Sequence, residues 1–221
     1  MPNYLKVVYN IKNKPYTDYP LQLCSYLFKR FAMKKGDKLL DIGCGRGDFT
    51  KGFKDLGLET VGADCEKSAS EILKGIEVKT LDAEKDSFPF GKETFDFVFS
   101  KSFIEHLRHP DNFIKESQRI LKLGGKIIVM TPDWQSQMCI FYNDYTHVHP
   151  YTHEALKDLL EIYGFREAKA ELFYQLPVLW KRPWLKIFSK SLQLLGPVKK
   201  IYRNKFIRWS RELMILASGK K

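Results

Sequence analysis

The sequence predicts an α/β fold, in which a mostly parallel sheet of seven strands carries helices on both faces. Runs of strand-forming apolar residues alternate with stretches of helical periodicity along the chain. A glycine-rich turn follows the first of these runs directly, as in doubly wound proteins that hold a nucleotide-like ligand. With 221 residues, 44% of them hydrophobic, the chain is long enough to form one domain, residues 1–221, with a sizeable core.

The apolar pattern also gives the order of the elements. The core, residues 36–174, follows an N-terminal helix, and Asp111 and Thr152 are expected to cap two of the later helices. The expected helices are 18–35, Asp48–Leu56, the segment from Asp111 to Gly124-Gly125, and Glu154–Tyr163. The expected strands are Lys38–Asp41, Glu59–Cys65, Glu77–Ala83, Thr94–Ser100, Lys126–Met130, Phe165–Tyr174 and 212–218.

The glycine turn, Gly43-x-Gly45-x-Gly47, follows a strand that ends on Asp41. Glycine is needed where φ is positive, or where a ligand must approach the backbone without meeting a Cβ atom. The spacing differs from the dinucleotide fingerprint Gly-x-Gly-x-x-Gly, because the third glycine comes one residue early and Asp48 takes its place. The alternative is an ordinary glycine-rich turn without a ligand.

Acidic residues close the next two expected strands. Asp64 lies 21 residues after Gly43, where a carboxylate can accept hydrogen bonds from both hydroxyls of a ribose. The alternative role for Asp64 is that of a helix N-cap. Asp82 stands at the end of the third strand.

These features resemble motif I and the later motifs of the class I S-adenosylmethionine-dependent methyltransferases. The likeness is to their small-molecule branch, with its quinone-biosynthesis and sugar-modifying enzymes, and covers residues 36–174. The later motifs are Asp82-Ala83, Phe88-Pro89-Phe90, Phe95-Asp96-Phe97-Val98, Glu105-His106-Leu107 and Lys122-Leu123-Gly124-Gly125. The resemblance implies a Rossmann-like sheet with an antiparallel last strand and S-adenosylmethionine as the cofactor. The cofactor-binding residues it implies are Asp41, Gly43, Cys44, Gly45, Gly47, Asp64, Cys65, Asp82, Ala83 and Ser100.

The implied reaction is an in-line displacement at a methyl carbon that is already activated by its sulfonium. The protein then needs a general base only for an acceptor that keeps its proton, such as a sugar hydroxyl. We therefore expect methyl transfer to oxygen of a small acceptor, which is sugar-containing, phosphate-modified or a lipid-linked glycan precursor. One alternative is methylation of a small amine, and another is a binding module without turnover.

All five histidines lie between His106 and His153, after the fourth strand and in the loop after the fifth. His106 is the expected general base, because an imidazole titrates near neutral pH, and the alternative is that it only anchors the next segment. The Asp144-Tyr145-Thr146-His147 segment resembles one found in glycan-pathway methyltransferases. Asp144 could orient His147 as a second catalytic histidine, or the segment could be plain loop packing.

The same segment could also form a divalent metal site. His147 and His149 would share a side of an extended segment, and Asp144 or Glu105 could add an oxygen ligand. Some quinone O-methyltransferases hold a cation with an additional acid four residues before the histidine. That position is Ser102 here, so we expect no metal.

Composition and the pattern of apolar runs indicate the compartment in which the protein is expected. The four cysteines are scattered, residues 1–14 contain no apolar signal-peptide core, and no apolar run is long enough to span a membrane. These features predict a cytoplasmic protein, in which contact with the inner face of the membrane remains open.

The net charge of +11 is concentrated at the C-terminal end. Residues 173–221 carry twelve of the 37 basic residues but only one of the 26 acidic residues. The basic amphipathic insertion, residues 175–211, is expected to form a helix over Pro183–Leu195 with Trp184, Ile187, Phe188, Leu192 and Leu195 on one face. It could contact an anionic membrane through residues 180–209, cover the sheet or a second subunit in a homodimer, or bind RNA. Nucleic acid is the least expected partner, because Ser100-Lys101-Ser102-Phe103 lacks the motif of base methylators.

Overall fold

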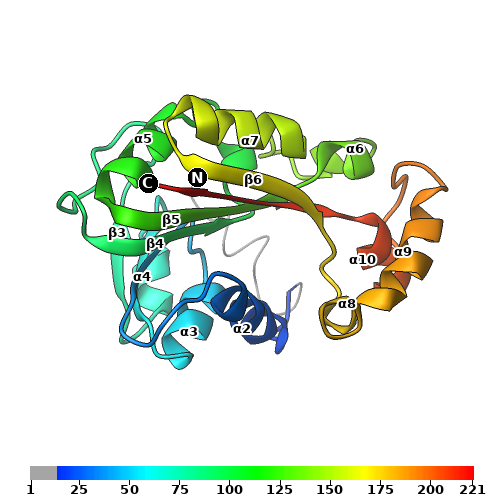
Figure 1. Ribbon diagram of the computed structural model, residues 1–221, viewed down its shortest axis with the longest axis horizontal. Coiled ribbons are helices and arrows are strands. Elements are labelled where there is room, and N and C mark those ends of the chain that lie inside the picture. The colour runs from blue at the N-terminus through cyan, green and yellow to red at the C-terminus, as the bar shows by residue number, and fades with distance from the viewer. Residues whose placement is uncertain (1–13) are drawn as a thin grey trace. The chain divides into compact units, whose positions relative to one another are not determined.

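The structure is a computed structural model that describes residues 14–221 (Figure 1). Its strands form a seven-stranded sheet in the order β3-β2-β1-β4-β5-β7-β6. The strands are β1 (Lys38–Ile42), β2 (Glu59–Asp64), β3 (Glu77–Thr80), β4 (Phe95–Lys101), β5 (Leu121–Pro132), β6 (Arg166–Phe173) and β7 (Met214–Lys220). Strand β1 is parallel to β2 and β4, β2 is parallel to β3, and β7 is antiparallel to β6. This order and the antiparallel last strand confirm the predicted Rossmann-like fold class.

Backbone contacts divide the chain into two compact units, which we call the first unit and the second unit. Within the described residues, the first unit contains 14–101, 110–127 and 221, and the second contains 102–109 and 128–220. The predicted single domain 1–221 stays a prediction, and the start of the chain, where no signal-peptide core is expected, lies outside the described residues. Within 14–221, no helix combines the length and apolar character needed to cross a membrane.

In the first unit, helices cover both faces of the parallel strands. Figure 1 shows α2, α3 and α4 below β1–β4 and α5 above them. These helices are α2 (Tyr19–Arg30), α3 (Asp48–Asp55), α4 (Ser68–Ile72) and α5 (Asp111–Ile120). The core between them is fully buried and includes Phe53, which packs edge-on against Phe99 of β4 with ring centroids 5.1 Å apart. Such an aromatic pair adds about 1 kcal/mol to the hydrophobic gain of burial.

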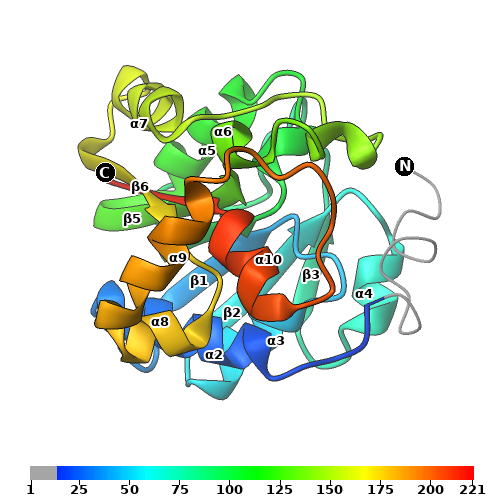
Figure 2. The same ribbon diagram turned by 90° about the vertical axis from the view of Figure 1, so that its right-hand side faces the viewer.

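In the second unit, α7 covers the antiparallel pair β6–β7, and three further helices gather near the start of β7 (Figures 1 and 2). Helix α7 begins as predicted, because the Thr152 side chain caps it by accepting from the Ala155 N–H at 3.3 Å. The elements of this unit are η1 (Ile104–His106), α6 (Trp134–Gln137), η2 (Phe141–Asn143), α7 (His153–Ile162), α8 (Pro177–Lys181), η3 (Pro183–Leu185), α9 (Lys186–Gln193) and α10 (Lys205–Arg211).

Several predicted boundaries are wrong for local reasons. The N-terminal helix ends at Arg30 and not at residue 35, since Ala32 adopts a left-handed φ of 52°. Asp111 does not cap α5, whose N-cap is Pro110 without a side-chain hydrogen bond. Gly124 and Gly125 do not end that helix but lie inside β5, where the Gly124 N–H donates to the Lys221 carbonyl at 3.1 Å.

The insertion also differs from its prediction. Helix α8 was not predicted, and the expected helix Pro183–Leu195 is η3 followed by α9. Leu192 does not share the exposed face of that helix but is half-buried.

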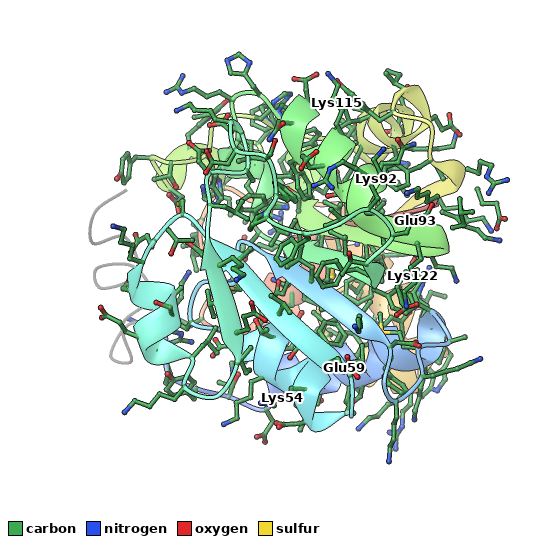
Figure 3. The ribbon with its side chains drawn as sticks, turned by 90° about the vertical axis from the view of Figure 1, so that its left-hand side faces the viewer. Lys54, Glu59, Lys92, Glu93, Lys115 and Lys122 are labelled. Carbon is green, nitrogen blue, oxygen red and sulfur yellow. The ribbon has the colours of Figure 1, made fainter. Side chains whose placement is uncertain are left out.

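Figure 3 looks onto the amino ends of the first unit's strands, where charged side chains such as Glu59, Lys122 and Lys54 reach the surface. Lys122 pairs with Asp96 at 2.8 Å, and Lys38 approaches Glu59 at 3.8 Å. Exposed pairs of this kind contribute less than about 1 kcal/mol each. The glycine turn and Asp64 follow the opposite, carboxyl ends of their strands, where ligands of α/β sheets bind.

Candidate functional site

The glycine turn of the first unit has the backbone conformation that its spacing requires. Gly43, Gly45 and Gly47 have φ values of 73°, 52° and 74°, which side chains with a Cβ rarely adopt. A Cβ at Gly47 would also lie 2.0 Å from Leu73 Cδ2. The alternation of glycines therefore reflects three left-handed residues in one tight turn between β1 and α3.

The backbone N–H groups of this turn are used inside the protein. Gly43 and Cys44 both donate to the Ala63 carbonyl, at 2.8 and 3.1 Å, and Gly47 donates to the Cys44 carbonyl at 2.8 Å. Gly45 donates to Asp64 Oδ2 at 2.8 Å. A pyrophosphate cradle needs such N–H groups for its anion, so the geometry agrees with the spacing in opposing a dinucleotide.

Asp64 is placed to meet a ligand at the turn. Its Oδ1 accepts from the Glu66 N–H at 2.9 Å while Oδ2 holds Gly45, so the carboxylate is fixed beside the glycines. The N-cap alternative is wrong, because α4 begins only at Ser68 and Lys67 is its N-cap residue. Burial raises the pKa of the Asp64 carboxyl, while these backbone hydrogen bonds lower it.

Asp41 lies fully inside the protein at the end of β1. The Thr50 hydroxyl donates to its Oδ2 at 2.6 Å, which ties the strand end to α3. Burial raises the pKa of the Asp41 carboxyl to about 7, the Thr50 hydrogen bond opposes this, and the charge of Asp64 adds to it. Asp41 thus stabilises the turn from beneath, and Thr50 is a partner that sequence reasoning missed.

The other expected cofactor residues occupy three kinds of position. Cys44 is buried with its side chain among Ala69 and Leu73, so only its backbone borders the turn. Cys65, next to Asp64, is exposed. Ser100 in β4 is completely buried, and its hydroxyl has no hydrogen-bond partner among the described residues.

The Asp82-Ala83 turn is held by the helix α5. Asn112 Nδ2 of α5 donates to the Ala83 carbonyl at 3.0 Å. Asp82 Oδ1 accepts from the Glu84 N–H at 3.0 Å, and its Oδ2 lies 3.4 Å from Lys85 Nζ. Strand β3 ends at Thr80, so Asp82 lies two residues beyond it and not inside the longer strand Glu77–Ala83 that the sequence predicts.

These residues fit S-adenosylmethionine, the cofactor implied by the resemblance. The turn lacks side chains at three positions, Asp64 offers a fixed carboxylate suited to a ribose, and the buried Ser100 hydroxyl has no hydrogen-bond partner within residues 14–221. A nucleoside with an amino-acid tail needs this mixture of acceptors and open backbone, and it needs no cradle for a pyrophosphate.

The N-terminal segment packs on the glycine turn and on the helix that follows it. Helix α2 packs on α3, with Cys24 Sγ 3.4 Å from the Phe49 carbonyl. The segment before α2 reaches the turn through Arg46, whose guanidinium lies 4.6 Å from the Tyr16 ring centroid and donates to the Lys14 carbonyl at 2.6 Å.

In the second unit, His106 belongs to a hydrogen-bonded series of side chains. Its Nδ1 lies 2.8 Å from Thr146 Oγ1, and that hydroxyl donates to Asp144 Oδ1 at 2.6 Å. A hydroxyl has one proton, and an ionised carboxylate can only accept it. Thr146 therefore accepts from His106, which places the imidazole proton on Nδ1 and makes Nε2 the basic nitrogen.

His147 lies beside His106, with ring centroids 4.8 Å apart. Its Nδ1 is 2.7 Å from the Phe141 carbonyl oxygen, which can only accept, so here too Nε2 is the basic nitrogen. Asp144 was expected to orient His147. Instead, the Phe141 carbonyl orients His147, and Asp144 acts on His106 through Thr146.

Glu105 fastens these segments together. The N–H groups of Val148 and His149 donate to its backbone carbonyl at 2.9 and 3.1 Å, which joins the loop after β5 to η1. Its side chain is completely buried, and Oε2 accepts from the Thr131 hydroxyl at 2.8 Å. Thr131 and Thr146 are site residues that sequence reasoning missed, although Thr146 lies inside the Asp-x-Thr-His segment that could have revealed it.

The same cluster could hold a cation. Glu105, His106 and His147 each place one ligand atom within 4.8 Å of the others. The Nδ1 proton of each histidine is already engaged, which is the usual arrangement for a metal ligand. These three ligands differ from the set suggested by the sequence, which included His149. His149 stacks instead on Tyr151, with ring centroids 4.5 Å apart.

The two sites define a class of protein. An order 3-2-1-4-5-7-6 with an antiparallel last strand, and a glycine turn that is not an anion cradle, belong to a Rossmann-like enzyme acting with a nucleoside ligand. A model of the methyltransferase domain family matches residues 17–169. The chain therefore belongs to the methyltransferase domain family, and it is an enzyme of that class. The resemblance to class I S-adenosylmethionine-dependent methyltransferases is confirmed.

Known proteins agree with this assignment. An uncharacterised protein of Methanocaldococcus jannaschii is 31% identical over 209 residues, covering 92% of this chain and 88% of its own. A ubiquinone biosynthesis O-methyltransferase of Pelagibacter ubique is 32% identical over 122 residues, which is 48% of each chain. The crystal structure of an S-adenosylmethionine-dependent methyltransferase from Archaeoglobus fulgidus has the same fold, with a TM-score of 0.66, 24% identity, and coverage of 91% of this chain and 94% of that one.

Proposed function

We propose that this protein is an O-methyltransferase that moves the methyl group of S-adenosylmethionine to a hydroxyl of a small acceptor, with His106 as the general base. The observation that carries the proposal is the series Asp144–Thr146–His106, with contacts of 2.6 and 2.8 Å. A methyltransferase for an acceptor that loses its proton unaided has little use for such a series.

The donor half of the reaction depends on the first unit. Bound S-adenosylmethionine supplies a methyl carbon that its sulfonium already makes electrophilic. Asp64 binds the ribose, and the glycine turn leaves room for the amino-acid tail. Because positioning is worth about 7–11 kcal/mol in reactions that bring two groups together, the main task of these residues is to hold the methyl carbon in one place.

The acceptor half depends on the second unit. S-adenosylmethionine held by the first unit would supply its methyl group to the acceptor oxygen, and the carbon–sulfur bonding pair would leave on sulfur. The hydroxyl proton moves to His106 Nε2, the nitrogen that the Thr146 contact makes basic. The Asp144 carboxylate, acting through Thr146, fixes the tautomer and stabilises the imidazolium, as a carboxylate does for a catalytic histidine in hydrolases.

The position of His106 in the sequence supports its role as the base. His106 comes only six residues after Ser100, in the segment that follows β4, which the resemblance puts beside the transferred methyl. The resemblance and the hydrogen-bonded link to Asp144 through Thr146 thus both point to His106.

The need for a base indicates the type of acceptor. A phenol has a pKa of about 10 and ionises readily, whereas an aliphatic or sugar hydroxyl holds its proton far more tightly. We therefore propose a sugar-containing or glycan-precursor hydroxyl as the acceptor. Phe141 packs on His147, and the Trp134 and Tyr142 rings that pack on Phe141 would offer apolar faces to the ring of a sugar. The ubiquinone O-methyltransferase among the relatives makes a quinone-type phenol the second candidate.

The test compares His106→Ala with the matched variant His109→Ala, whose histidine lies in the same segment but is exposed. Turnover is followed as S-adenosylhomocysteine formed with labelled donor and a pool of small hydroxyl compounds. We expect His106→Ala to lose about a hundredfold or more in kcat while its calorimetric affinity for the donor stays unchanged, and His109→Ala to behave as the native protein.

Other outcomes would contradict the proposal in different ways. Full activity of His106→Ala at high pH, with methylated nitrogen in the product, would indicate amine methylation. Tight donor binding without turnover on any acceptor fraction would indicate a binding module.

A further inference from the structure

Helix α9 buries a polar face and exposes an apolar one, which is the reverse of an ordinary amphipathic helix. In the second unit its polar residue Ser189 is completely buried, while Trp184, Ile187, Phe188, Leu194 and Leu195 are exposed by 55–87%. Ile187 and Phe188 lie on α9, Trp184 lies in η3 just before it, and Leu194 and Leu195 follow its last residue, Gln193. We call these five exposed apolar residues the apolar stripe of α9. Burying it would gain free energy that the unit itself leaves unused.

The outward orientation of the stripe is fixed by contacts on the other side of the helix. Ser189 Oγ meets Ser210 Oγ of α10 at 2.8 Å, and the two helices lie side by side (Figure 2). Gln193 Nε2 lies 2.8 Å from the Tyr174 hydroxyl and 3.1 Å from the Ser210 carbonyl. The polar inner face has its partners, so rotating α9 to bury the stripe would break several hydrogen bonds.

The turn that ends the stripe is held as firmly. Arg211 of α10 is buried, and its Nη2 donates to the Gly196 carbonyl at 2.9 Å. Its Nη1 donates to the Tyr202 hydroxyl at 2.7 Å. A buried arginine that holds carbonyls of the α9–α10 connection keeps Leu194 and Leu195 at the surface.

The charge around the stripe has one sign. Lys186 and Lys190 lie on α9 itself and are exposed, and Lys199 and Lys200 follow in the connection. Glu212, the single acidic residue of the segment 173–221, is buried and accepts from Arg208 Nε at 2.7 Å. The surface of this segment therefore carries positive charge and no exposed carboxylate.

We infer that the apolar stripe of α9, with the basic residues of 180–209 around it, docks on an anionic membrane surface. In this geometry the apolar side chains enter the boundary between headgroups and acyl chains, and the lysines stay at the anionic headgroups. Trp184 at the start of the stripe suits such an interface, because its ring is apolar and its N–H is polar.

Other occupants fit less well. A second copy docked on the same face would bring Lys186 and Lys190 near their own symmetry mates, with no exposed acid of this segment to pair with them. Nucleic acid would use the lysines but would leave Ile187, Leu194 and Leu195 in contact with water. Only a lipid surface uses the charge and the apolar stripe together.

The first experiment is co-sedimentation of the full chain with vesicles of phosphatidylglycerol mixed with phosphatidylcholine, compared with phosphatidylcholine alone. We expect binding to the anionic vesicles that weakens as salt rises but persists, because the apolar contribution is not screened. Trp184 fluorescence should shift to shorter wavelength on binding, and the shift should be absent in Trp184→Phe.

Matched variants separate the two contributions. Phe188→Ser is compared with Ile162→Ser, which removes an even more exposed apolar side chain at the end of α7. The double variant Lys186→Glu/Lys190→Glu is compared with Lys92→Glu/Lys115→Glu, at positions labelled in Figure 3. We expect at least about a tenfold loss of partitioning for each variant in the insertion and none for its control. Donor affinity should stay unchanged in all four.

The proposal is overturned if the chain binds neutral vesicles equally well, or if the variants of the insertion bind as their controls do. It is also overturned by a concentration-dependent dimer in sedimentation that Phe188→Ser dissolves, which would make a second copy the occupant. Retention on RNA without vesicle binding would assign the surface to nucleic acid.

Discussion

The two units build their sites by different physical means. In the first unit the glycine turn is a backbone structure. It is fixed by three left-handed residues and by N–H groups that donate to the backbone carbonyls of Cys44 and Ala63. In the second unit the His106 cluster is a side-chain structure, joined across 40 residues by the Thr146 hydroxyl. A site made of backbone is encoded by spacing, whereas a site made of side chains depends on how distant segments fold together.

Helices α3 and α9, one from each unit, differ in which side chains they bury. Helix α3 buries Phe53 against Phe99 and needs nothing outside its unit. Helix α9 buries a serine and presents its apolar stripe to solvent. Phe53 of α3 thus has its packing partner, whereas α9 carries an apolar surface that implies a further partner.

The largest expected effect tests the first unit. Asp64→Ala removes the carboxylate that holds Gly45 and that we expect to bind the donor's ribose. Because hydrogen bonds to a charged group contribute about 1.5–3 kcal/mol each, we expect donor affinity in calorimetry to fall by about a hundredfold or more. Asp55→Ala, an exposed acid at the end of α3, is the control and should bind as the native protein does.

If Asp64→Ala lowers the donor affinity no more than Asp55→Ala does, the first unit is not the donor site. The circular dichroism spectrum should stay native in both variants. Asp64→Asn, which keeps an acceptor for the Gly45 N–H, should lie between them.

Much of the fold was predictable, since strand, turn and helix signals are local. The glycine spacing predicted β1 and α3 to within one residue, and the Thr152 cap predicted the start of α7. Glycines 124 and 125 misled the prediction, because they read as a helix stop. Their place in β5 depends on pairing with Lys221, almost a hundred residues away.

The candidate site was predictable to a lesser degree. Asp144, His106 and His147 were selected from the sequence as candidate catalytic residues, but their grouping was not, because no sequence pattern shows that Thr146 joins Asp144 to His106 or that the Phe141 carbonyl takes His147. The outward face of α9 was also unpredictable. Periodicity shows that an apolar face exists but does not show whether it is buried.

The next effect tests the second unit. Thr146→Val keeps the shape of a nearly fully buried side chain but removes the hydroxyl between Asp144 and His106. The tautomer of His106 is then no longer fixed, so we expect kcat to fall about tenfold to a hundredfold with KM and donor affinity little changed. The pH–rate profile should also shift, because the imidazolium loses its link to the carboxylate.

Thr146→Ser is the rescue variant, since it restores the hydroxyl, and it should recover most of the activity. If Thr146→Val and Thr146→Ser are equally slow, the hydroxyl is not a positioning group and the series does not act as a unit.

A third prediction concerns metal at the cluster of Glu105, His106 and His147. We expect turnover to survive a chelator, because the proposed base is an imidazole, and we expect added Zn²⁺ to inhibit by binding the Nε2 atoms. His147→Ala should relieve that inhibition while it keeps most of the activity. Loss of turnover with the chelator, restored by a divalent cation, would instead show that the cluster works as a metal site.

The smallest effect returns to the first unit and concerns stability. Burial raises the pKa of Asp41 to about 7 in the folded protein, above its unfolded value of about 3.9. A raised folded pKa means that the folded state binds the proton more tightly. The stabilisation is therefore full below about pH 4 and is lost as pH rises through about 7. Asp41→Asn does not titrate and keeps an acceptor for the Thr50 hydroxyl.

We therefore expect Asp41→Asn to match the native protein near pH 4 and to exceed its unfolding free energy by about 1–3 kcal/mol near pH 8. Urea unfolding at a series of pH values measures this difference. Asp55→Asn, with an exposed carboxyl on α3, should show no such trend. A difference that stays constant with pH would mean that Asp41 ionises inside the folded unit at its ordinary pKa, and that the base of the glycine turn carries a buried negative charge.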